Sequence, residues 1–133
     1  MFVGVCRLTF HLHGVASLKG KRRIMRRVIE RTRAKFNVSA AEVADNDMHK
    51  RGVVGISVLG NDRAHVDGMM STVIRFIDRM GVAPISGIET EVISINGEMG
   101  DGLPQSIDDW RNAALFDMEA SDEADADDEE DLW

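Results

Sequence analysis

The chain has 133 residues, enough for one domain of ordinary size with a single modest core. Its net charge of −7 hides two parts of opposite sign. Residues 1–96 carry 15 Lys and Arg against 9 Asp and Glu, whereas residues 97–133 carry one Arg against 14 acids. A single cysteine, Cys6, excludes an intramolecular disulfide, and no apolar stretch approaches the roughly 20 residues that span a bilayer. We therefore expect a soluble, reduced, cytoplasmic protein without membrane contact.

The first elements in chain order are a strand and a basic helix. Apolar and polar residues alternate over 2–12, which predicts a half-buried strand that ends at Gly14. Ser17 is a suitable N-cap, and apolar residues at helical spacing predict a helix from there to Phe36. The side chains that we expect to face the core from this helix are Leu18, Met25, Val28, Ile29, Thr32 and Phe36.

Three further strands are indicated. Residues 38–43 are small and β-prone, and residues 53–59 form a nearly continuous apolar run that is typical of a central strand. Residues 87–96 alternate again, which predicts a final strand.

A second helix is expected between the last two strands. Asn61 or Asp62 is its N-cap, and Gly81 ends it after Met80. Its expected apolar stripe is Val66, Met69, Met70, Val73, Ile74 and Ile77.

The order strand, helix, strand, strand, helix, strand predicts the α+β ferredoxin-like βαββαβ sandwich. In this fold a four-stranded antiparallel sheet carries both helices on one face. We assign residues 1–96 to this domain. Residues 97–133 form a Gly-containing linker and an acidic tail that we expect to be largely disordered.

The basic helix is the first candidate site. Nine of the 15 cations of residues 1–96 lie in residues 17–36, where Glu30 is the one acid. Such a field attracts polyanions, which favours contact with RNA phosphates over the alternative of a merely solvated face. The predicted contacts are Lys19, Lys21, Arg22, Arg23, Arg26, Arg27 and Arg33.

The open face of the sheet is the second candidate. Base stacking there would need aromatic residues on the first and third strands, and the third strand has none. Val3, Val5 and Arg7 lie on one face of the first strand. Because exposed apolar faces often mark an interface, these residues predict a homodimer contact.

Two smaller groups of residues could bind an anion or a metal ion. Arg63 and His65 lie at the start of the second helix, where an anion could bind, but capping by Asp62 and packing by His65 are the favoured explanation of the motif. His11 and His13 share a strand face, and the loop residues Asp45, Asp47 and His49 carry further ligand types. Nothing in the sequence shows that these two groups meet in space, so we predict no metal and no cofactor.

The acidic tail leaves three interpretations open. It is a solubilising extension, a polyanion mimic that inhibits the basic helix, or a motif that binds a protein partner through Trp110, Phe116 and Trp133. No nucleophile and base occur at a recognisable spacing, so we predict that the protein is not an enzyme.

Several linked motifs resemble the YlxP family of small bacterial proteins. They are SLKGKR, FNVSAAEV, the short D-N-D loop and DRAH, together with the opening MFVGVCRL, and they cover about residues 1–96. His49, where many relatives carry an aromatic residue, and the acidic tail depart from the pattern. The resemblance implies the ferredoxin-like fold and, through the family's gene neighbours in translation, a role near ribosomes or RNA. It implies no catalytic residue.

The sequence therefore predicts a non-enzymatic RNA- or ribosome-associated protein that contacts phosphates through its basic helix. The alternative is a homodimeric protein-interaction module that uses the open sheet face and the tail.

Overall fold

The computed structural model describes residues 1–95, 106–109 and 111–112. Its contacts divide the chain into two units, Met1–Asn96 and Gly97–Trp133. The long helices and all strands that the structure describes belong to the first unit.

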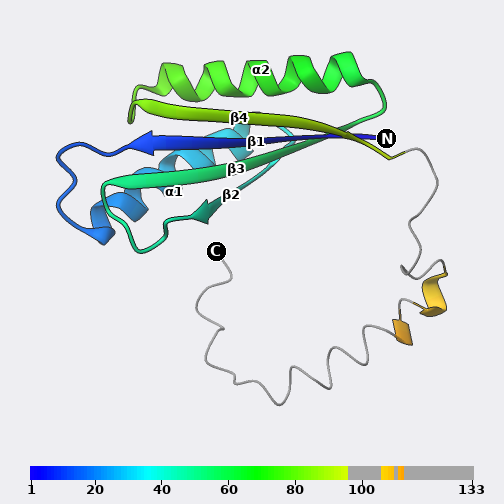
Figure 1. Cartoon of the computed structure of the whole chain (residues 1–133), viewed down its shortest axis with the longest axis horizontal. Coiled ribbons are helices and arrows are strands. Elements are labelled where there is room, and N and C mark those ends of the chain that lie inside the picture. Colours follow the sequence, from blue (N-terminus) through cyan, green and yellow to red (C-terminus); the bar gives the residue numbers. More distant parts are fainter. Residues whose placement is uncertain (96–105, 110, 113–133) are drawn as a thin grey trace. The chain divides into compact units, whose positions relative to one another are not determined.

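The first unit holds a four-stranded antiparallel sheet and two long helices (Figure 1). In chain order its elements are β1 Phe2–His11, α1 Leu18–Lys35, β2 Ser39–Ala44, β3 Arg51–Gly60, α2 Arg63–Met80 and β4 Ile85–Ser94. The strands lie in the order β2-β3-β1-β4, and every neighbouring pair is antiparallel. The predicted ferredoxin-like fold is confirmed, and the predicted bounds agree with these elements to within two residues.

The core lies between the two helices and one face of the sheet. As the alternation predicts, every second residue of β1 is buried there, including Cys6, Leu8 and Phe10. The helices contribute the buried apolar residues Met25 and Val28 of α1 and Val66, Met70, Val73 and Ile77 of α2. The other predicted apolar core positions are half-buried: Leu18, Ile29, Phe36, Met69 and Ile74.

Local signals in the sequence mark where both helices begin and where α2 ends. Ser17 caps α1 by accepting a hydrogen bond from the Gly20 amide at 3.1 Å, and Asp62 caps α2 by accepting one from the Ala64 amide at 2.8 Å. Gly81 ends α2 in the left-handed conformation at φ 61°, which glycine adopts without steric cost.

A buried lysine joins the start of α1 to the second strand. Lys21 is fully buried, and its ammonium lies 3.0 Å from Glu42 Oε1 on β2. Its geometry with Glu42 is that of an ion pair, because Glu42 Oε1 accepts no hydrogen bond from the described residues. The ammonium instead donates to the carbonyl oxygen of Asp45, in the loop between β2 and β3. The Asp45 carboxylate in turn pairs with Arg51 at 3.0 Å, so the loop is held at both of its ends.

We expect the two halves of this pair to contribute unequally to stability. Glu42→Gln leaves a fully buried ammonium without its counter-charge and should lower the free energy of unfolding by about 3 kcal/mol. Lys21→Met leaves a carboxylate whose side chain is 20% exposed, so water can partly replace the lost partner. Its cost should be smaller, about 1–2 kcal/mol. Urea unfolding measures both values, with the exposed Lys19→Met as the matched control; equal costs would contradict this account.

Burial also controls the single thiol. Desolvation raises the pKa of Cys6, because the thiolate is disfavoured in the apolar core. Since the thiolate is the reactive form, the native protein should react with a thiol reagent at pH 8 far more slowly than the unfolded chain. Reaction is followed with and without denaturant. Equal rates in the two states would show that the core opens readily at β1.

Candidate functional site

The first helix presents a broad cationic surface to solvent. Eight of its nine cations are exposed: Lys19, Arg22, Arg23, Arg26, Arg27, Arg31, Arg33 and Lys35. We call these eight residues the basic face. Glu30 is the one acid within α1, so the helix supplies little compensating charge of its own.

The helical period explains why the cations face outward. The buried positions of α1 are Lys21, Met25, Val28 and Thr32, which recur at intervals of four, three and four residues and form one stripe. With that stripe against the sheet, all other positions lie at the margins of the helix or point to solvent. The pattern of apolar residues therefore positions the basic face.

Within the described part of the chain, few carboxylates pair with the basic face. Among the described residues, no carboxylate forms an ion pair with Lys19, Arg22, Arg23, Arg26, Arg27 or Arg31. Arg33 is engaged, because its guanidinium donates to the carbonyl oxygen of Ala40 at 2.7 Å. Elsewhere in the unit cations do find partners, as Arg7 does with Glu89 at 2.5 Å. The positive charge of α1 is thus largely uncompensated in the described structure.

One predicted contact is wrong. Lys21 cannot meet a ligand outside the protein, because its side chain is fully buried and bound to Glu42 and Asp45. Arg31 and Lys35 were missed, although the signal was present. They continue the four-residue spacing of Arg27 and are exposed like it.

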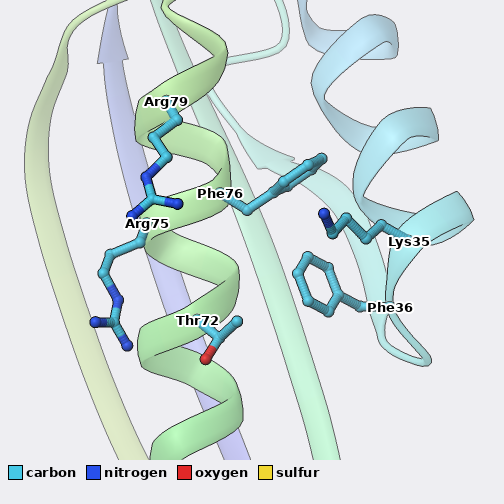
Figure 2. A pocket seen from close by; sticks show the side chains of 6 residues that line it. All are labelled: Lys35, Phe36, Thr72, Arg75, Phe76 and Arg79. Atoms are coloured by element: carbon cyan, nitrogen blue, oxygen red, sulfur yellow. The ribbon is translucent and has the colours of Figure 1, made fainter.

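A shallow pocket of about 180 Å³ lies where the end of α1 meets α2. Its lining combines three cations, two aromatic rings and a hydroxyl: Lys35, Arg75, Arg79, Phe36, Phe76 and Thr72 (Figure 2). We call it the interhelix pocket. The Phe36 and Phe76 rings meet edge to face with centroids 5.3 Å apart, and the Lys35 ammonium lies 5.0 Å from the Phe76 centroid. Sequence reasoning missed this site because its residues come from two helices and Phe76 lies beside the predicted stripe.

The start of α2 does not offer its amides to an anion. Asp62 Oδ1 accepts from the Ala64 amide at 2.8 Å and from the His65 amide at 3.4 Å. The carboxylate therefore occupies the position that an anion would take, and it would repel one. Arg63 and His65 are both exposed, so the expected packing of His65 is wrong and the capping role of Asp62 is confirmed.

The open sheet face carries the predicted dimer residues at its centre. Val3 and Val5 are half-buried, and Arg7 is exposed and paired with Glu89 on β4. The register places Leu59 of β3 and Ile93 of β4 on either side of Val3. Leu59 is 66% exposed and Ile93 is 43% exposed, so an apolar patch crosses three strands.

The histidines of β1 lie side by side without assembling a metal site. The rings of His11 and His13 are 4.8 Å apart. Within residues 1–95, 106–109 and 111–112, however, no group of three or more His, Cys, Asp or Glu is placed to hold a metal ion.

The predicted anchors for a protein partner lie outside the described residues: Trp110, Phe116 and Trp133.

Across the part of the chain that the structure describes, neither long helix is apolar enough to cross a membrane.

Comparisons with known proteins identify a family. The family described as "Protein of unknown function (DUF503)" matches residues 3–90. The "Uncharacterized protein YlxP" of Bacillus subtilis (strain 168) is 33% identical over 67 residues, which are 50% of this chain and 73% of that protein.

Solved structures are similar at lower levels. The de novo designed protein Foldit4 has a TM-score of 0.42 at 14% identity, over 71% of this chain and 98% of that one. A NIPSNAP family protein from Agrobacterium tumefaciens strain C58 has a TM-score of 0.40 at 15% identity, over 80% of this chain and 100% of that one. Because the family match spans nearly the whole ferredoxin-like unit, the chain belongs to the DUF503 family, as its resemblance to YlxP predicted.

Proposed function

We propose that this protein is a non-enzymatic RNA- or ribosome-associated protein that contacts phosphates through the basic face of α1. The observation that carries the proposal is the concentration of exposed cations on one helix, six of which form no ion pair with any described carboxylate. Surface cations usually intermix with acids, and an excess of one sign over a whole helix face attracts polyanions.

The residue types support phosphate contact over base recognition. Six of the eight cations are arginines, whose planar guanidinium forks match the geometry of phosphate oxygens. Contacts of this kind position a nucleic acid without reading its sequence, and they weaken steeply as salt rises. No Phe, Tyr or Trp side chain lies on the open face of β1 or β3, where RNA-recognition domains stack bases.

The acidic segment 97–133 is the proposed modulator of this affinity. Its net charge of −13 exceeds in magnitude the +8 of the basic face. Negative charge tethered to the same chain lowers the local attraction for RNA, most strongly at low salt. Every described core residue of the first unit lies within residues 1–95, so a chain ending at residue 96 retains them all.

Reversing charges on α1 should abolish RNA binding. We expect Arg22→Glu/Arg23→Glu/Arg26→Glu to remove detectable binding to ribosomes and to structured RNA at low salt. For the unmutated protein, each phosphate contact should contribute about one unit to the slope of log K against log salt. The measurement is fluorescence anisotropy across a salt series with full-length protein and with residues 1–96, and the shorter chain should bind more tightly.

Matched variants test whether the charge of the basic face alone accounts for RNA binding. The same three positions changed to lysine keep the charge and should keep most of the affinity, whereas Glu30→Gln should raise it slightly. If neither the full chain nor residues 1–96 binds RNA or ribosomes at low salt, the proposed function is wrong.

A second candidate function is a homodimeric protein-interaction module. The apolar patch of Val3, Leu59 and Ile93 on the open sheet face favours it, since large exposed apolar residues grouped on a sheet mark interfaces. A second copy would cover this face while leaving α1, on the opposite side of the sheet, free for RNA.

Light scattering after gel filtration tests this candidate. The unmutated protein should have the mass of a dimer, and Leu59→Glu should have that of a monomer, because a charge buried in the contact is unfavourable. The matched control is Ile88→Glu. Ile88 is an exposed residue of β4 whose register partner Leu8 points into the core, so it lies on the other face. A monomeric mass for the unmutated protein would contradict the dimer.

A further inference from the structure

The interhelix pocket lies at the end of a line of cations on α1. Within the basic face, every fourth residue is a cation: Lys19, Arg23, Arg27, Arg31 and Lys35. Side chains at four-residue intervals form a continuous ridge along a helix, with neighbours about 6 Å apart along the axis. The last member of this ridge, Lys35, lines the pocket.

The ridge also turns toward α2 as it runs. Rows of this kind are inclined to the helix axis by about 26°. On one flank of α1, Arg33 reaches β2 by donating to the Ala40 carbonyl oxygen, so α2 lies on the other flank. Lys35 points to that flank, because its ammonium lies over the Phe76 ring of α2 (Figure 2). The cationic ridge and the interhelix pocket therefore form one continuous surface.

Beyond Lys35 the surface changes from purely cationic to cationic and aromatic. Phe36 and Phe76 are half-buried, each with part of its ring exposed at the pocket. Arg75 and Arg79 line the pocket from α2, and one nitrogen of Arg75, Nε, is held by the Ser71 carbonyl oxygen at 3.2 Å. The site thus combines two partly buried aromatic rings with positive charge, a lining that suits a planar ring carrying an anion.

A nucleotide has this combination of a planar base and a phosphate. Proteins that hold single-stranded nucleic acid combine a positive track along the backbone with aromatic side chains that stack bases. An unstacked base in a loop, bulge or overhang is available for such contact, whereas a base within a duplex is covered by its neighbours.

We propose that the interhelix pocket binds one unstacked nucleotide of an RNA whose backbone follows the ridge from Lys19 to Lys35. This inference rests on the proposed function and deepens it: the preferred ligand is RNA with a single-stranded segment next to a duplex or loop. The base packs against Phe36 and Phe76, and its phosphate pairs with Lys35 and Arg79. The base is held by its ring face, so the pocket selects unpaired nucleotides with little preference among sequences.

The test uses the full chain and three RNAs whose backbone phosphates have the same spacing. The first is a blunt duplex, the second carries a three-nucleotide 3′ overhang, and the third carries the same overhang without its bases. We expect the overhang with bases to bind roughly tenfold more tightly than the abasic one, since base–aromatic stacking is lost in the latter. Because all three are measured with unmutated protein, no result depends on whether a variant folds.

A substitution at Phe76 then tests whether the tighter binding of the overhang with bases comes from the interhelix pocket. Phe76→Leu keeps an apolar side chain against the core and removes the stacking surface. It should reduce the advantage of the overhang with bases to about twofold and leave affinity for the blunt duplex unchanged. The matched control is Phe2→Leu, which changes a half-buried ring of β1 outside the pocket. It should keep the full advantage.

The outcomes separate this inference from the proposed function. If the two overhangs bind equally and the blunt duplex also binds, the pocket does not hold a base, and the inference is overturned while phosphate contact by α1 stands. If no RNA binds, both fail. Adenosine monophosphate in equimolar competition should displace nothing; displacement would identify a free nucleotide as the ligand and overturn the RNA assignment.

Discussion

The buried contact between Lys21 and Glu42 is the constraint on which the first unit depends. A charged group that is buried away from water is strongly destabilising unless it stays next to its counter-charge. The pair therefore holds the first turn of α1 against β2 in one geometry. The Asp45 carbonyl oxygen adds a further ligand for the same ammonium. With Lys21 directed inward, successive residues turn by about 100°, which brings Arg22 and Arg23 to the outside. Lys21 thus reinforces the orientation that the buried stripe gives α1, in which the other cations face solvent.

That orientation gives the helix two roles. Its apolar stripe closes the core, and its opposite side collects like charges that repel one another and gain from a polyanion. The aromatic pair at its end adds a different kind of contact, because Phe36 comes from α1 and Phe76 from α2. As we propose, phosphate attraction along α1 would be independent of sequence, while the pocket would discriminate between paired and unpaired nucleotides. Together the two surfaces would direct the protein to structured RNA with exposed single strands.

The motifs that carry the family resemblance hold residues that maintain the fold. Ser17 and Asp62 cap the helices, and Lys21 and Glu42 form the buried pair. The predicted strands and helices agree with the structure because their signals are local: alternation, helical spacing and cap residues each act within a few positions. Their order then permits one simple antiparallel arrangement. The resemblance accordingly supports the architecture, whereas the proposed function rests on exposed residues around these positions.

By itself the sequence determined the ferredoxin-like order of elements, the split of charge along the chain and the helix that carries the basic face, because composition and periodicity are properties of neighbouring residues. Only the tertiary structure decided which cation is lost to the interior. Helical spacing places Lys21, unlike Lys19, in line with Met25 and Val28, but a lysine is tolerated there only because Glu42, more than twenty residues away, pairs with it. The interhelix pocket was decided in the same way, since Phe36 and Phe76 become neighbours only when both helices pack on one face of the sheet.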